Sequence, residues 1–113
     1  MNKKIAIPVD ASGYLDGHFG HCKFFEIIGI EQNEIVSQEK VVPPPHEPGV
    51  LPKWLSEKGA TDIIAGGMGH KAIQIFNYNN VNVFVGAPQL TAVELAKGFI
   101  NNTIEFKANY CDH

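Results

Sequence analysis

Cysteine is scarce in this sequence. Cys22 and Cys111 are the only two among 113 residues, so a scaffold held together by several disulfide bridges is excluded. Nothing in the sequence is typical of secretion, and cytoplasmic thiols are normally kept reduced. We therefore predict two free thiols.

An excess of positive charge and a long apolar run are also lacking. Nine Lys and Arg against twelve Asp and Glu give a formal net charge of −3, which offers no long-range attraction to nucleic acid or anionic lipid. No run of about 18 apolar residues occurs, and residues 1–4 lead into a strand-like segment rather than a signal-peptide core. The sequence predicts a cytoplasmic protein without nucleic-acid or membrane partners.

The composition is that of a chain that buries a core. Hydrophobic residues make up 44% and charged residues 19%, which is ordinary for a soluble globular protein. Because typical domains run to about 100 to 150 residues, we expect one domain over residues 1–113.

The pattern of apolar residues predicts alternating strands and helices. Residues 5–9 form a nearly continuous apolar run, typical of a strand buried on both faces. Polar residues separate two further strands, which we expect to pair as an antiparallel hairpin. The expected elements after residue 9 are strands 22–30 and 34–42, helix 51–58, strand 62–65, helix 70–78, strand 81–85 and a helix after Thr91.

This order predicts an α/β fold. Strands that alternate with helices imply parallel pairing with right-handed crossovers, so we expect a mixed five-stranded sheet with a parallel centre, the hairpin at one edge and about three helices. Gly59 stands where a left-handed helix cap would fall. Thr91 and Glu94 have the spacing of a capping box.

The densest group of metal-ligand types is His18, His21 and Cys22. Two imidazoles and a thiol within five residues are ligands that zinc and softer transition metals prefer. They follow the first strand, in a loop at the carboxyl edge of the parallel sheet, where ligands bind in such folds. An alternative interpretation has Phe19 packed under the loop, Cys22 buried as a small hydrophobe and the histidines facing solvent.

A glycine-rich loop, residues 66–69, precedes the helix at 70–78. Its backbone N–H groups and the helix dipole favour a bound anion, while Met68 and His70 add a thioether and an imidazole. Neither a P-loop nor the dinucleotide G-x-G-x-x-G spacing is present. The alternative is that these glycines only allow the strand to pack closely against the helix.

Two further groups of residues contain metal-ligand types. Asp10, at the end of the first strand, suggests a divalent-metal hydrolase, but two-metal chemistry needs several carboxylates, and Asp62 starts its strand and so lies at the opposite edge. No nucleophile elbow indicates acyl transfer. Cys111 and His113 would add metal ligands if the tail folded back, but chain ends are usually mobile, and we expect a mobile tail.

An ordered set of segments resembles a known family. The set comprises residues 4–10, the run His18 to Cys22 leading to two phenylalanines, residues 62–69 and residues 83–87. Together they resemble the dinitrogenase iron-molybdenum cofactor-binding family of nitrogenase accessory proteins, over nearly the whole chain. The resemblance implies a ribonuclease-H-like three-layer fold without nuclease chemistry.

The resemblance also implies a function. Such a protein is not an enzyme but binds or carries an iron-sulfur or molybdenum-containing cluster during cofactor assembly or storage. Its partners would be that cluster and the proteins that donate and accept it, with the chain as a monomer or homodimer. The other possibility that the residues leave open is a small interaction or regulatory module that binds a partner protein or an anion and no metal.

The residues expected to form the ligand cleft follow from the same resemblance. They are Phe19, Gly20, His21, Gly66, Gly67, Met68 and Gly69. His18, His21 and Cys22 are expected to approach the metal. Because the usual site of four thiolates is absent, binding would be labile, assisted by histidine or shared between two chains.

Overall fold

A mixed β-sheet with helices on both faces forms the structure. The computed structural model describes residues 2–17, 19–45, 47 and 49–111, without the side chain of His21. In the described part, six strands lie in the order β3-β2-β1-β4-β5-β6. The strands are β1 (Asn2–Val9), β2 (Phe24–Glu31), β3 (Glu34–Val41), β4 (Asp62–Ile64), β5 (Asn82–Val85) and β6 (Ala108–Tyr110).

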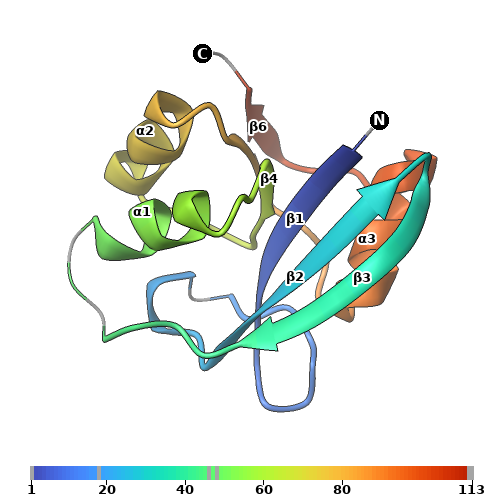
Figure 1. Ribbon diagram of the computed structural model, residues 1–113, viewed down its shortest axis with the longest axis horizontal. Helices are drawn as coiled ribbons and strands as arrows, with labels where there is room; N and C mark the ends of the chain where they lie inside the picture. Colours follow the sequence, from blue (N-terminus) through green and yellow to red (C-terminus); the bar gives the residue numbers. More distant parts are fainter. Residues whose placement is uncertain (1, 18, 46, 48, 112–113) are drawn as a thin grey trace.

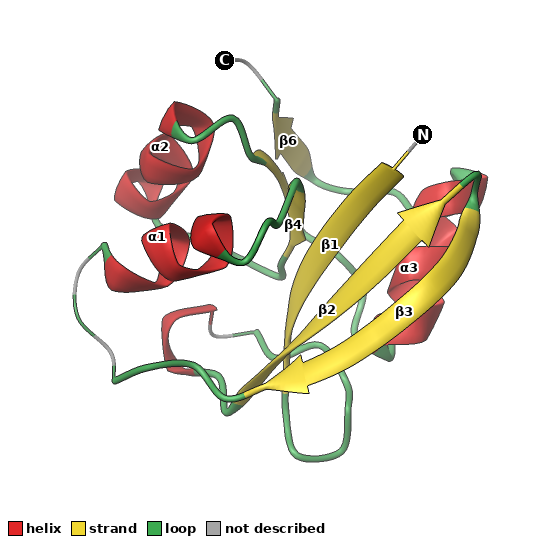
Figure 2. Ribbon diagram, viewed as in Figure 1, coloured by secondary structure: helices red, strands yellow, loops and turns green. Residues whose placement is uncertain are grey.

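The helices divide the molecule into three layers. Helices α1 (Val50–Glu57) and α2 (His70–Tyr78) lie on one side of the sheet, and α3 (Ala92–Asn101) lies on the other (Figure 1). A short 3-10 helix, η1 (Phe19–His21), lies on the side of α1 and α2 (Figure 2). No helix in the described ranges is long and apolar enough to cross a membrane.

The predicted parallel centre and antiparallel hairpin are both confirmed. β1 pairs in parallel with β4, and β4 with β5, while β2 and β3 form the hairpin beside β1. The predicted count of five strands was wrong by one, because β6 adds an antiparallel strand at the edge of β5. β6 is three residues long, so its alternation of Ala, Asn and Tyr is shorter than the roughly four to eight residues over which such a pattern indicates a strand.

The core lies on both faces of the sheet. On the side of α1 and α2, Phe25, Leu55 and Phe76 are fully buried. On the side of α3, Ile64 and Leu95 are fully buried. β1 reads as an almost continuous apolar run because helices cover both of its faces.

The helix ends agree with the sequence signals. Gly59, with φ of 89°, follows α1. At α3 the Thr91 hydroxyl accepts from Glu94 N at 3.2 Å, and the Glu94 carboxylate accepts from Thr91 N at 3.0 Å. Helix α2 differs, because its N-cap is Gly69 without a side-chain hydrogen bond, and no acidic residue lies in its first turn. The N–H groups of that first turn have no partner within the helix.

Candidate functional site

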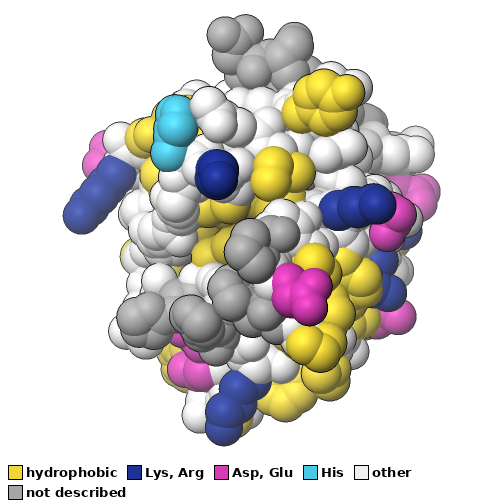
Figure 3. All heavy atoms as spheres, turned by 90° about the vertical axis from the view of Figure 1, so that its left-hand side faces the viewer, with side chains coloured by type: hydrophobic (Ala, Val, Ile, Leu, Met, Phe, Trp, Pro, Cys, Tyr) yellow, Lys and Arg dark blue, Asp and Glu magenta, His cyan; other side chains and the backbone are white. Residues whose placement is uncertain are grey.

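Three chain segments meet at the carboxyl ends of β1 and β4 and form a cleft of about 430 Å³. The segments are the loop that contains η1, the start of α1, and the glycine loop that leads into α2. Figure 3 shows this side of the molecule, where apolar side chains are exposed near the centre and single charged side chains lie around them. The described lining residues are Gly17, Phe19, Gly20, Glu47, Gly49, Leu51, Pro52, Gly67, Met68, Gly69, Lys71, Ala72 and Ile75.

Phe19 anchors the first wall of the cleft. The residue is 7% exposed, and its ring makes edge contacts with Phe25 and Phe76, at centroid distances of 5.6 Å and 5.7 Å. The same residue lines the cleft. The two interpretations of Phe19 are therefore compatible, since it packs under its loop and also forms part of the cleft surface.

The glycine loop presents bare backbone to the cleft. A Cβ atom added at Gly67 or Gly69 would have no atom of the protein within 4 Å, and neither residue has a positive φ. The N–H groups of Gly67, Met68 and Gly69 donate to no other group of the described chain. Close packing within the fold thus explains neither glycine, whereas a ligand that approaches the backbone would.

Gly66 has a different place from its neighbours. It is absent from the cleft lining, and its carbonyl accepts from Gly86 N at 2.9 Å. A Cβ atom at Gly66 would lie 3.5 Å from the Cα of Gly17. Of the predicted cleft residues, Phe19, Gly20, Gly67, Met68 and Gly69 line one cleft, and Gly66 holds the loops behind it together.

Of the three expected metal ligands, Cys22 is the one whose side chain the structure describes. His18 and the side chain of His21 lie outside the described residues. Cys22 is buried in the core, where its thiol donates to the carbonyl oxygen of Phe19 at 3.6 Å. Burial, and to a smaller degree the negative charge of Asp16, raises the pKa of the Cys22 thiol to about 12. Because the thiolate is the form that binds metal, the thiol of Cys22 is poorly prepared for that role.

The burial of Cys22 predicts a measurable difference in reactivity. At pH 8 we expect iodoacetamide to modify Cys111, which is exposed, at least about tenfold faster than Cys22, because both access and thiolate fraction limit the reaction. Mass spectrometry of the native protein measures both rates. In denaturant the two thiols should react alike, and equal rates in the native protein would contradict the buried position of Cys22.

Other candidate residues lie away from the cleft or have structural roles. The Asp10 carboxylate accepts from the N–H groups of Ser12 and Tyr14, at 2.9 Å and 3.1 Å, and so shapes its own turn.

Burial and the nearby Asp62 raise the pKa of Cys111, with Lys3 opposing them. Because Cys111 directly follows β6, which runs antiparallel to β5, it lies at the end of the sheet where β4 and β5 begin, opposite to the cleft. The described residues include no group of three or more His, Cys, Asp or Glu that could hold a metal ion.

Sequence reasoning missed two charged residues of the cleft. Glu47 lies in the connector before α1, and Lys71 lies in the first turn of α2. No motif marks either position. The one local sequence feature that could have pointed to Lys71 is the lack of an acidic residue in the first turn of α2. Glu47 reaches the cleft only through tertiary packing.

Comparisons with known proteins agree with this fold. An uncharacterized protein of Methanocaldococcus jannaschii, MJ0580, is 31% identical over 107 residues, which cover 90% of this chain and 89% of that protein. The crystal structure of PH0822 has 29% identity and a TM-score of 0.84, covering 95% of this chain and 96% of its own. The apo form of the orange protein from Desulfovibrio gigas, at 21% identity, has a TM-score of 0.79 over 94% and 93% of the two chains, which shows a shared fold.

The family model described as dinitrogenase iron-molybdenum cofactor matches residues 1–102. That range holds all three helices and five of the strands, and it includes every described residue of the cleft. The chain therefore belongs to the dinitrogenase iron-molybdenum cofactor family.

Proposed function

We propose that this protein binds and carries an anionic metal-sulfur cluster, of iron-sulfur or iron-molybdenum type, as cargo during cofactor assembly or storage. The protein is a carrier and not an enzyme. The observation that supports this most directly is the bare backbone of Gly67 and Gly69 at the wall of an apolar cleft. Family membership supplies the type of cargo.

The chemistry of the cleft suits a sulfur-coated anion. Unpaired N–H groups of the glycine loop and the first turn of α2 offer hydrogen bonds and positive potential. Most of the remaining surface is apolar, with Phe19, Leu51 and Met68 among the lining side chains. Hydrogen bonds to cluster sulfurs are a usual way in which proteins hold and tune such groups. The volume of the cleft is within the range of small-ligand sites, about 300 to 1,000 Å³.

The state of Cys22 favours loose retention. Its thiol, with a pKa of about 12, is not poised to form a strong metal-thiolate bond. Binding through backbone N–H groups, with His18 and His21 as the proposed side-chain contacts, would let the cluster leave intact. A carrier needs such release, because donor and acceptor proteins must exchange the cluster through it.

Alanine at the two open glycines tests the proposal. The parent and the Gly67→Ala and Gly69→Ala variants are incubated anaerobically with iron, sulfide and molybdate, then desalted and measured by metal analysis and visible absorption. We expect each variant to retain about tenfold less metal, because a Cβ atom occupies the space in which the cluster meets the backbone. The melting temperature should stay equal or rise slightly for Gly67→Ala, since Gly→Ala at a compatible backbone position stabilises by about 0.4–1 kcal/mol. For Gly69→Ala it should fall slightly, because alanine is a poorer helix N-cap than glycine.

The His21→Ala variant separates imidazole contacts from backbone contacts. A loss of metal only in this variant would show that His21, and not the glycine backbone, retains the metal, and would contradict the role of the glycines. A parent protein that remains colourless and metal-free under all these conditions would overturn the carrier function. It would favour the interaction module, which binds a partner protein or an anion and no metal.

A further inference from the structure

We infer that Lys71 and Glu47 set the charge of the cargo and the strength with which it is held, Lys71 by attracting an anion and Glu47 by limiting that attraction. This inference rests on the proposed function and adds a specificity mechanism to it. Among the described residues, these two are the ionisable side chains that line the cleft. The remaining lining is apolar side chain and glycine backbone.

The position of Lys71 lowers the stability of its own helix. It is the second residue of α2, whose first turn contains no acidic residue, and a positive charge near a helix N-terminus opposes the helix dipole. No carboxylate lies anywhere on α2. The contrasting case is α3, which has Glu94 in its first turn and a complete capping box.

Lys71 forms no ion pair with any described residue. The ion pair formed within the described part of the chain joins Lys3 to Asp62, at the far edge of the sheet. Lys71 is exposed and borders the cleft beside the free N–H groups of the glycine loop. Its charge therefore adds to the positive potential that the start of α2 directs at a ligand.

Glu47 has the opposite effect on the same cleft. It is exposed, lies in the connector that precedes α1, and borders the cleft that Lys71 borders. Its carboxylate repels an anion at short range. The reduced affinity suits cargo that must be released. Because the Glu47 carboxylate opposes the Lys71 ammonium, the cleft disfavours ligands of high negative charge.

Binding of tetrathiomolybdate, a coloured and sulfur-coated dianion, measures both effects by equilibrium dialysis at low ionic strength. We expect Lys71→Met to weaken binding about five- to tenfold and Glu47→Gln to tighten it about threefold. The matched controls are Lys97→Met on α3 and Glu105→Gln, which make the same charge changes at exposed positions outside the cleft. Both controls should bind as the parent does.

A Lys71→Glu variant distinguishes a loss of binding from a loss of folding. A negative charge suits the start of a helix, so this variant should melt no lower than the parent while it loses binding of tetrathiomolybdate. If the parent binds and either Lys71→Met or Glu47→Gln leaves the affinity unchanged, the inference is wrong and the carrier function stands. If the parent takes up neither tetrathiomolybdate nor cluster, both proposals fail together.

Discussion

Replacing Phe19 by alanine is expected to lower the free energy of unfolding by about 3 to 4 kcal/mol and to abolish retention of the cluster. Truncation of a buried phenylalanine typically costs about 3–5 kcal/mol, as lost burial plus a cavity, and Phe19 also loses two edge contacts, to Phe25 and Phe76. η1 would lose the side chain that fixes it to the core. Urea denaturation measures the stability, and anaerobic reconstitution measures the retention.

A control on the other face of the sheet separates the two effects. Phe106 is partly buried and packs against Phe84, with ring centroids 5.2 Å apart, in the cluster beneath α3. Phe106→Ala should destabilise the protein by about 1–2 kcal/mol, less than full burial would give, and leave the cleft intact. If Phe19→Ala unfolds at the same urea concentration as the parent, η1 is not anchored by its ring.

The regular elements were predictable because their signals are local. α2 begins and ends where the sequence predicted, at His70 and Tyr78, since the apolar spacing of Ile73 and Phe76 is helical and glycines precede it. The strands buried on both faces read as apolar runs for the same reason. Mixed pairing of the sheet then follows from the order of the elements.

The start of β2 was predicted less well. We expected the strand to begin at Cys22, whereas it begins at Phe24. Residues 19–21 form η1 instead, and this turn carries the thiol of Cys22 toward the carbonyl of Phe19 and into the core. Strand propensity could not reveal this, because the turn is stabilised by Phe19 packing on Phe76, which is distant in sequence, as well as on Phe25.

The cleft could be predicted in part for a related reason. The glycine loop and the loop after β1 follow from the topology, since the carboxyl ends of parallel strands share one edge. Glu47 and Lys71 reach the same cleft only because α1 and α2 pack beside each other. The sequence places them 24 positions apart with no common motif, so only the tertiary structure brings their charges together.

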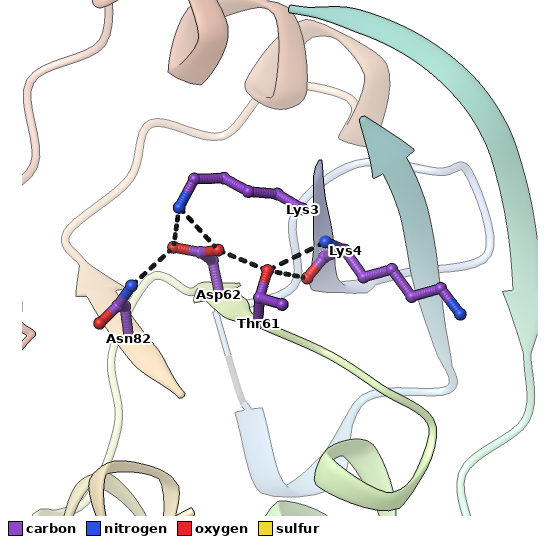
Figure 4. A network of polar contacts seen from close by, with 5 residues as sticks. All are labelled: Lys3, Lys4, Thr61, Asp62 and Asn82. Carbon is purple, nitrogen blue, oxygen red and sulfur yellow. Dashed lines mark hydrogen bonds and ion pairs between the residues drawn. The ribbon is translucent and has the colours of Figure 1, made fainter. Parts of the chain in front are cut away.

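The second large effect is expected at the other end of the sheet, where Asp62 is fully buried. Its carboxylate accepts from Lys3 Nζ at 3.3 Å, from the Thr61 hydroxyl at 2.6 Å and from Asn82 Nδ2 at 3.1 Å (Figure 4). Asp62→Ala removes this acceptor from Lys3 and Asn82, while the Thr61 hydroxyl can still donate to the carbonyl oxygen of Lys4 at 3.1 Å. Breaking a buried pair by removing one partner costs about 3–5 kcal/mol, and since Lys3 is 26% exposed and can turn to water, we expect a loss of about 3 kcal/mol in urea denaturation.

The position of Asp62 makes this variant informative about function as well. Because Asp62 begins β4 and the cleft lies beyond the end of that strand, Asp62→Ala should bind the cluster as the parent does at temperatures where it remains folded. Asp62→Asn, which can still accept a hydrogen bond, should lose less stability. A stable Asp62→Ala protein would show that the network contributes little. A folded variant that cannot retain the cluster would instead place the functional site at the edge of the sheet where Lys3, Asp62 and Cys111 lie, and would contradict the cleft.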